Sequence, residues 1–326
     1  MSAVLLAVEG VTRRFGGGRR LLGRSRPALH AVQGVSLEVR RGETLGIVGE
    51  SGCGKSTLAR MLVGLDRPSE GAIRFGGEDV TTLRGEARRG LARRIQYVFQ
   101  DPLSSLNPRK TIRQILEAPL HHLLAMPGED RKARLEELMD AVRLRPEFLE
   151  RYPHEFSGGQ AQRIGIARAL AAAPDLIVLD EPVSALDVSV QAQILNVLQD
   201  LKRRFALTYV FISHDLAVVE SVSDRVAVMY FGRIVENGPA EHLFRRPAHP
   251  YTRLLFSAAP VPGEKSIVGE ETIAELPDPL APPPGCAFAP RCARASERCR
   301  RERPALATGS DGTFACHHPL IDDMEN

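Results

Sequence analysis

The stretch Gly49-Glu50-Ser51-Gly52-Cys53-Gly54-Lys55-Ser56 decides the fold, because it matches the pattern G-x-x-x-x-G-K-[S/T] in full. An apolar run, Thr44 to Val48, precedes it, and a helical pattern from Ser56 to Leu65 follows. Glycines let the chain turn tightly, so that backbone N–H groups and the N-terminus of the next helix point at phosphate oxygens. The stretch therefore predicts a P-loop, in which Lys55 reaches the β- and γ-phosphates and Ser56 holds Mg²⁺.

Two acidic residues follow a second apolar run, Leu176 to Leu179. Asp180 would stand at the end of a buried strand and position Mg²⁺, and Glu181 could polarise the attacking water as a general base. Taken alone, the pattern also fits an ordinary strand that ends in a solvated acidic turn. Together with the P-loop it indicates a nucleoside triphosphatase, and kinases, GTPases and helicases remain open.

The composition is that of a soluble globular protein, with 326 residues of which 43% are hydrophobic and 25% charged. A net charge of +3, from 43 basic and 40 acidic residues, is too small to indicate nucleic acid as a partner. No apolar run approaches the ~20 residues that cross a bilayer. The order of residues from Met1 to Val8 does not fit a signal peptide, because basic residues follow the apolar ones. We therefore expect a cytosolic protein that reaches a membrane only by docking onto another protein.

Strand-like and helix-like segments alternate along the chain, which predicts an α/β fold with a mostly parallel sheet. Strands are expected at Leu5–Val8, Val35–Val39, Thr44–Val48, Ala72–Phe75, Leu176–Leu179, Thr208–Ser213 and Val226–Tyr230. Helices are expected within Thr111–Arg151, most clearly at Glu129–Leu144, and at Ala161–Ala173 and Gln191–Arg204. A loop is expected from Gly16 to Pro27, and a proline-rich linker from Ala259 to Gly285.

A second anion-binding segment, Phe156-Ser157-Gly158-Gly159-Gln160, precedes the expected helix at Ala161. A serine hydroxyl, two glycines and a helix N-terminus suit an anion. One nucleotide needs only one phosphate cradle, so a second cradle about a hundred residues away suggests a site completed by another subunit. A plain helix cap with flexible glycines is the alternative when the segment is considered alone.

The combination of motifs resembles the ATP-binding cassette (ABC) ATPases. Phe156 to Gln160 resembles their signature motif, with Phe156 where leucine is commonest, and Ser184-Ala185-Leu186-Asp187 resembles their D-loop. Gln100, after Tyr97-Val98-Phe99, resembles the Q-loop glutamine, and His214, after Phe211-Ile212-Ser213, the switch histidine. Phe15 is the candidate aromatic residue to stack on adenine.

The resemblance covers about residues 4–255 and implies a P-loop ABC-type nucleotide-binding domain. Such a domain has a RecA-like core, an antiparallel β subdomain and a helical subdomain, here at about residues 101–160. A cysteine-bearing C-terminal extension would occupy residues 256–326. Two such domains face each other head to tail, and each ATP lies between the P-loop of one and the signature serine of the other.

The resemblance also assigns residues to roles. Glu181, His214 and Gln100 would be catalytic, and Ser56, Gln100 and Asp180 would hold Mg²⁺. ATP would contact Phe15, Gly49, Ser51, Gly52, Cys53, Gly54, Lys55, Ser56, Thr57, Gln100 and Asp180 of one chain, and Ser157, Gly158, Gly159, Gln160 and Asp187 of its partner. Because none of these elements is degraded, we expect active ATP hydrolysis.

Three further segments resemble ATP-binding subunits of dipeptide, oligopeptide and nickel importers, above all the second ATPase subunit of the dipeptide system. The segments are Asp101–Pro108, Glu181–Gln191 and Pro247–Thr252. The resemblance implies a second, related but non-identical ATPase subunit, two membrane permease subunits and an extracytoplasmic substrate-binding protein, with this chain peripheral at the cytoplasmic face of the inner membrane. Another cargo, such as nickel or a different small solute, or a soluble non-transport ABC ATPase, are the alternatives.

Four of the five cysteines, Cys286, Cys292, Cys299 and Cys316, lie in the C-terminal tail. Five cysteines in a cytosolic chain point away from disulfides. The segment Cys286–Cys292 resembles the cysteine motif of the same transporters, some of which bind an iron–sulfur cluster there. Four thiolates suit a [4Fe–4S] cluster or zinc, and free thiols are the third possibility.

Overall fold

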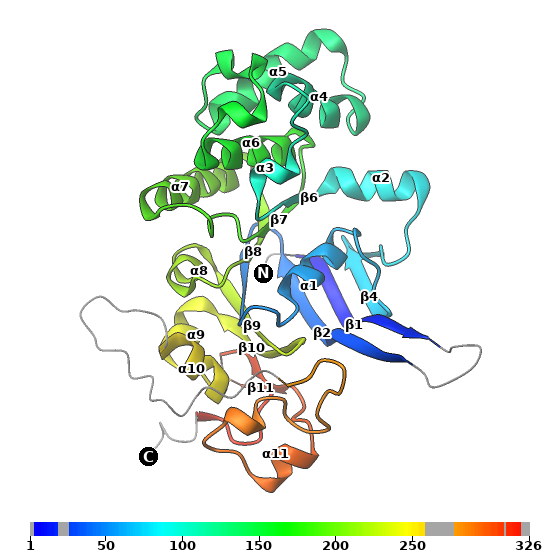
Figure 1. Ribbon diagram of the computed structural model, residues 1–326, viewed down its shortest axis with the longest axis vertical. Coiled ribbons are helices and arrows are strands. Elements are labelled where there is room, and N and C mark those ends of the chain that lie inside the picture. Colours follow the sequence, from blue (N-terminus) through cyan, green and yellow to red (C-terminus); the bar gives the residue numbers. More distant parts are fainter. Residues whose placement is uncertain (1–2, 19–25, 258–276, 310, 321–326) are drawn as a thin grey trace.

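The computed structural model describes residues 3–18, 26–257, 277–309 and 311–320. Figure 1 shows a helical lobe at the top, a central sheet, an antiparallel sheet at the right and the C-terminal segment at the bottom. None of the helices in these ranges combines the length and hydropathy that crossing a bilayer requires.

The central sheet of the described chain has the strand order β11-β12-β10-β9-β3-β8-β7-β6. The five strands from β9 to β6 are parallel, and β10 returns antiparallel to β9. Every residue of β3, β7 and β8 is buried, as expected for parallel strands covered on both faces. The bounds are β3 (Thr44–Val48), β6 (Ile95–Val98), β7 (Leu176–Asp180), β8 (Thr208–Ile212), β9 (Arg225–Tyr230) and β10 (Arg233–Pro239).

Six helices of the described chain lie between or after the strands of this sheet. They are α1 (Lys55–Leu62), α2 (Gly85–Arg94), α7 (Val188–Phe205), α8 (Leu216–Val222), α9 (Ala240–Arg245) and α10 (Pro250–Ser257). Helices α1, α2, α8 and α9 contact the strands of the sheet. Helix α7 begins at the capping side chain of Asp187, and it buries Ile194, Val197, Leu198 and Leu201 on one face. The P-loop follows β3, Asp180 ends β7 and Glu181 comes directly after it. These residues therefore lie at the carboxyl edge of the sheet, where parallel sheets bind ligands.

The second sheet is antiparallel, with the order β2-β1-β4-β5. Its strands are β1 (Val4–Gly18), β2 (Arg26–Arg40), β4 (Glu70–Phe75) and β5 (Glu78–Asp79). The prediction of a loop from Gly16 to Pro27 is wrong at both ends. Strands β1 and β2 extend into it, because Gly16 pairs with Ala28 and Gly18 with Arg26. A β ladder is made by backbone groups, so it continues through a glycine-rich sequence that carries no strand pattern. Residues 19–25 lie outside the described part.

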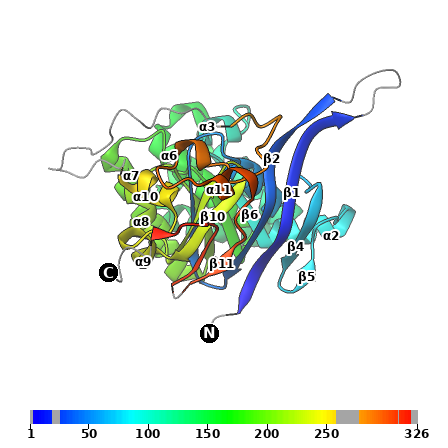
Figure 2. The same ribbon diagram turned by 90° about the horizontal axis from the view of Figure 1, so that it is seen from below.

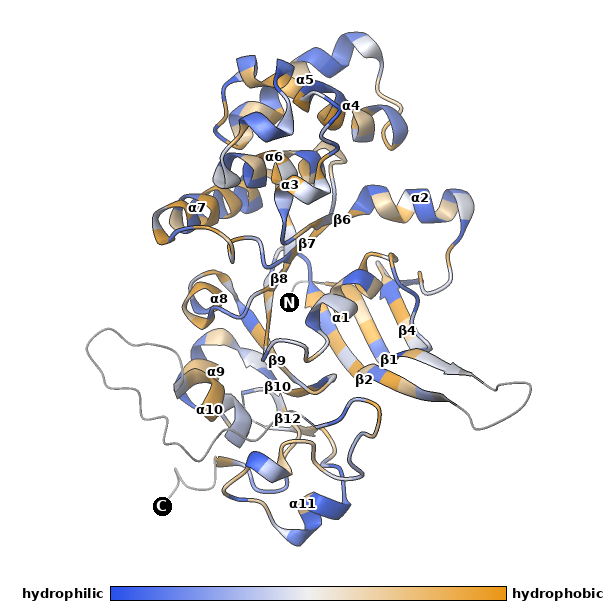
Figure 3. Cartoon of the chain, in the orientation of Figure 1, coloured by the Kyte–Doolittle hydropathy of each residue, from blue (hydrophilic) through white to orange (hydrophobic). Residues whose placement is uncertain are grey.

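The helical lobe contains α3 (Pro102–Ser105), α4 (Ile112–His122), α5 (Gly128–Ala141) and α6 (Gly158–Ala171), with 3₁₀ turns η1 (Pro146–Glu150) and η2 (Pro153–Glu155). Helix α5 ends three residues before the expected Leu144 and buries Leu135, Leu138 and Met139. Figure 3 shows hydrophobic residues on the inner sides of this lobe and along the strands, whereas α2 is largely hydrophilic.

The C-terminal segment contains η4 (Ala289–Arg291), α11 (Glu297–Arg301), β11 (Ala307–Thr308) and β12 (Thr313–Phe314). Strand β12 pairs with β10, with Glu236 opposite Phe314, so this segment continues the central sheet. Strand β12 lies between β10 and β11, and Figure 2 shows this C-terminal segment at the edge of the sheet beside β10. Most of the proline-rich linker expected from Ala259 to Gly285 falls within residues 258–276, which lie outside the described part. The described residues that follow it pack directly on the core.

Candidate nucleotide-binding site

The P-loop joins β3 to α1, and two of its glycines have no room for a side chain. A Cβ at Gly49, whose φ is 153°, would lie 2.0 Å from the carbonyl oxygen of Met229. A Cβ at Gly54, whose φ is 104°, would lie 2.2 Å from the carbonyl oxygen of Ala31. Gly54 also caps α1 without a side-chain hydrogen bond, which leaves the first N–H groups of the helix suited to an anion.

Lys55 is held inside the P-loop, with only 5% of the residue exposed. Its ammonium donates hydrogen bonds to the carbonyl oxygens of Gly49 at 2.7 Å and Glu50 at 2.9 Å. A phosphate oxygen could take the place of either carbonyl as acceptor. The Lys55 ammonium, which is expected to bind the phosphates, is therefore already positioned in the loop.

Asp180 and Ser56 are in contact, as the expected Mg²⁺ site requires. The Ser56 hydroxyl donates to Oδ1 of Asp180 at 3.2 Å, and the Tyr97 hydroxyl donates to Oδ2 at 2.5 Å. Burial raises the pKa of Asp180 above its usual range, although both hydroxyls favour the carboxylate. Oxygen ligands of this kind suit Mg²⁺. Tyr97 was not predicted to belong to the site, and its position three residues before Gln100 was the only signal in the sequence.

Glu181 has a strained backbone, with φ of 47°, and its N–H donates to the carbonyl oxygen of Ile212 at 2.9 Å. Its carboxylate meets two other residues expected to be catalytic. Gln100 Nε2 donates to Oε2 of Glu181 at 2.9 Å, and His214 Nδ1 lies 3.3 Å from the same oxygen. The structure therefore brings together three side chains that follow the ends of β6, β7 and β8.

The signature segment caps α6. The Ser157 hydroxyl accepts from the N–H of Gln160 at 3.4 Å, and the Gln160 side chain accepts from the N–H of Ser157 at 3.1 Å. A Cβ at Gly159 would lie 2.4 Å from Cγ1 of Val190, so α6 starts close against α7. Asp187 caps α7 by accepting from the N–H of Val190 at 3.0 Å.

The two anion-binding segments are on separate parts of the chain. Helix α6 belongs to the helical lobe, whereas α1 belongs to the core (Figure 1). Phe15 is on β1 and 38% exposed, with the Arg13 guanidinium 4.5 Å from its ring centroid. It is therefore not a core residue, and its contact with adenine stays a prediction.

The four tail cysteines line one small cavity together with His249 and His317. Among the described residues, however, no three His, Cys, Asp or Glu side chains lie close enough to hold a metal ion. Burial raises the pKa of the Cys286 and Cys292 thiols and raises that of Cys316 to about 11. The arrangement of these side chains therefore does not support the expected [4Fe–4S] or zinc site.

The geometry defines the class of protein as a P-loop ATPase of the ABC type. The ABC transporter family profile matches residues 32–184, and a profile for the C-terminal region of oligopeptide and dipeptide transporters matches residues 235–299. The dimeric structure of the ATP-binding cassette MJ0796 has a TM-score of 0.65 and 30% identity, covering 72% of this chain and 99% of that one.

Relatives extend the match over the tail. The chain is 50% identical to a probable peptide ABC transporter ATP-binding protein of Sinorhizobium fredii, covering 97% of this chain and 90% of that protein. It is 48% identical to the di/tripeptide transport ATP-binding protein DppF of Pseudomonas aeruginosa, covering 96% and 97%. This chain belongs to the family of ATP-binding proteins of oligopeptide and dipeptide ABC transporters, and it is an ATPase.

Proposed function

We propose that this chain powers the import of dipeptides or oligopeptides by closing on a second ATPase subunit when ATP binds. The observation that carries the proposal is the contact of Glu181 with both Gln100 and His214, beside the Ser56–Asp180 pair. The names of the relatives support peptides as the cargo. The alternatives, another small solute or a role outside transport, have no such support.

In this proposal, each residue of the site acts on ATP through its position. Lys55 and the backbone of residues 49–57 bind the phosphates, and Phe15 stacks on adenine. Ser56, Asp180 and Gln100 hold Mg²⁺, which neutralises charge on the phosphates. Glu181 takes the proton of the attacking water, and His214 contacts the γ-phosphate.

The second wall of the site comes from the partner subunit. The partner's signature segment and D-loop contribute residues that correspond to Ser157, Gly158, Gly159, Gln160 and Asp187 of this chain. Since ATP binds the closed pair better than the open one, it shifts the population toward closure, and hydrolysis releases it. We propose that the partner is a related, non-identical ATPase subunit.

The closing movement acts on two permease subunits, supplied with cargo by an extracytoplasmic substrate-binding protein. This chain would therefore be peripheral at the cytoplasmic face of the inner membrane. In the proposed division of the chain, residues 4–255 form the ATPase domain and residues 256–326 form the extension.

A metal centre in the extension is a separate proposal, with a [4Fe–4S] cluster as its first form and zinc as its second. What supports it is the shared cavity of Cys286, Cys292, Cys299 and Cys316. Metal binding would require these thiols to deprotonate and move closer, a coupling that is common in thiolate sites.

Uptake of a labelled dipeptide in cells that lack the native gene tests the transport proposal. We expect the wild-type chain to restore uptake and Lys55→Ala to abolish it. Lys132→Ala, at an exposed lysine of α5, is the matched control and should behave as wild type. Restored uptake of nickel or another solute, with no peptide uptake, would contradict peptide as the cargo.

A further inference from the structure

We infer that Tyr251 and Arg291 are positioning residues for the P-loop, because both hold Glu50, the second residue of that loop. The inference rests on the nucleotide site described above. According to this inference, the segment Pro247–Thr252 and the cysteine-bearing tail both position the P-loop for ATP binding.

Arg291 forms a two-pronged ion pair with Glu50. Nη1 lies 2.8 Å from Oε2, and Nη2 lies 2.9 Å from Oε1. The two side chains are 11% and 28% exposed, so water screens the pair only partly. Parallel hydrogen bonds between guanidinium and carboxylate fix direction as well as distance. The pair therefore fixes the Glu50 side chain against the tail.

Tyr251 holds the backbone of the same residue. Its hydroxyl accepts the N–H of Glu50 at 3.0 Å, and the tyrosine is fully buried. The segment before it fixes its position, because His249 Nδ1 accepts the N–H of Tyr251 at 3.0 Å. The N–H groups of Ala248 and His249 in turn donate to the Glu236 carboxylate, at 2.6 and 2.9 Å.

The remaining polar group of Glu50 faces the nucleotide site. Its carbonyl oxygen accepts from Lys55 Nζ at 2.9 Å. Glu50 thus connects Arg291 and Tyr251 on one side to the phosphate-binding lysine on the other. A shift of the Glu50 backbone would change the position of Lys55, and catalytic sites lose rate steeply when groups move by about 1 Å.

A packed aromatic cluster supports both contacts. The ring centroids of Tyr230 and Tyr251 are 4.5 Å apart, and that of Phe288 lies 5.4 Å from Tyr251. The Arg291 guanidinium lies 5.8 Å from the centroid of Phe288. Such packing limits the positions that Tyr251 and Arg291 can take.

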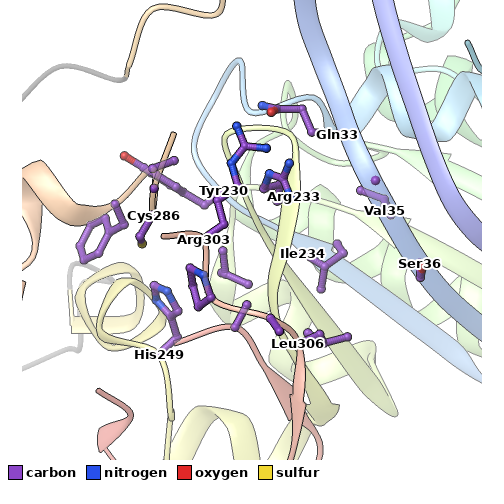
Figure 4. Close-up of a pocket in the computed structure, with 18 residues that line it drawn as sticks. Gln33, Val35, Ser36, Tyr230, Arg233, Ile234, His249, Cys286, Arg303 and Leu306 are labelled. Atoms are coloured by element: carbon purple, nitrogen blue, oxygen red, sulfur yellow. The ribbon is translucent and has the colours of Figure 1, made fainter. Parts of the chain in front are cut away.

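The same cluster borders the tail cysteines. Tyr230, Phe288 and Cys286 line a cavity of about 270 Å³ between the core and the extension, and Figure 4 shows Tyr230 and Cys286 beside it. Arg291 directly precedes Cys292 in the chain. A rearrangement at the cysteines would therefore reach the P-loop through Arg291 and Glu50.

The test measures the affinity of the purified full-length chain for a fluorescent ATP analogue with Mg²⁺. We expect Arg291→Ala and Glu50→Gln each to weaken binding about tenfold, and the double variant to be no weaker than the worse single variant. Tyr251→Phe, which removes only the hydroxyl, should weaken it less. Arg298→Ala, which removes an exposed ion pair with Glu302 in the same tail, should leave the affinity unchanged.

Two further measurements separate positioning from loss of fold. Arg291→Lys keeps the charge and should recover part of the affinity, and thermal unfolding shows which variants are folded. Folded Arg291→Ala with wild-type affinity, or losses that simply add in the double variant, would overturn the inference but leave the ATPase assignment intact. A wild-type chain that binds no nucleotide would overturn both.

Discussion

The nucleotide site and the cysteine cavity are both built from segments that lie far apart in the sequence, yet only the first is already assembled. Gln100 and His214 contact Glu181, and Ser56 contacts Asp180. The four tail cysteines share a cavity but, within the described residues, do not form a metal-binding group. Hydrogen-bond donors and acceptors attract one another without a ligand, whereas neutral thiols attract one another only weakly and must lose their protons to bind a cation.

The largest effect that we expect concerns Glu181 in the assembled site. Glu181→Gln keeps a side chain of the same size but cannot take a proton, so kcat for ATP hydrolysis should fall about 10²–10⁴-fold with ATP affinity retained. Steady-state ATPase assays and nucleotide binding measure the two quantities. Glu220→Gln, at an exposed position of α8, is the control. Substantial turnover in Glu181→Gln would remove its role as the base.

Metal analysis tests whether the second site assembles only with its ligand. If the proposed cluster forms, anaerobically purified protein should be brown with about four irons per chain, and Cys299→Ser should lose the colour. If the metal binds only the folded chain, losing it should cost about 4 kcal/mol at a concentration a thousand times its Kd. Colourless protein with stoichiometric zinc would favour the second form of the proposal. Protein with neither metal would leave four free thiols.

Two glycines of α6 test the packing that carries the signature segment. Gly159→Ala should destabilise the chain by about 1–3 kcal/mol, because the new Cβ would lie 2.4 Å from Val190. Gly165→Ala meets nothing within 4 Å and should stabilise the chain by about 1 kcal/mol through helix propensity. Urea unfolding measures both changes. Equal effects would show that α7 does not constrain the start of α6.

The smallest effect is expected at Asp175, which belongs to neither site. Its carboxylate pairs with Arg41 at 3.0 Å and with Arg94 at 2.9 Å. Burial alone would raise the pKa of this carboxyl group, but the two ion pairs hold the pKa below the usual 3.8. The ionised form therefore stabilises the fold above that value, and the contribution is lost as the pH falls through the lowered pKa. Asp175→Asn should cost about 1 kcal/mol at neutral pH. The difference from wild type, measured by urea unfolding, should shrink in acid; a constant difference would contradict the ion pairs.

The sequence predicted those parts of the molecule whose residues stand at short, fixed spacings. The P-loop, the Asp180–Glu181 pair and the signature segment are each read from about ten residues or fewer, and each lies where the expected strand or helix places it. The catalytic roles of Gln100, Glu181 and His214 came from the family resemblance, and the structure adds that the three side chains are in contact.

Contacts between distant segments were not predictable in the same way. Arg291 and Glu50 are 241 residues apart, and neither stands in a pattern that pairs it with the other. Strand β12 has only two residues, too few to show any periodicity, yet it extends the central sheet. The hydrogen bond from Tyr97 to Asp180 likewise depends on the pairing of β6 with β7.

The proposed function requires ATP to be bound between two cassettes, and light scattering of the Glu181→Gln variant tests this pairing most directly. With MgATP, this variant should form a stable pair with itself or with the sister ATPase subunit of its transporter. Ser157→Arg replaces the serine that would contact the nucleotide of the sister subunit. This substitution should abolish the pair. A variant that binds ATP and stays monomeric in every mixture would contradict the shared site.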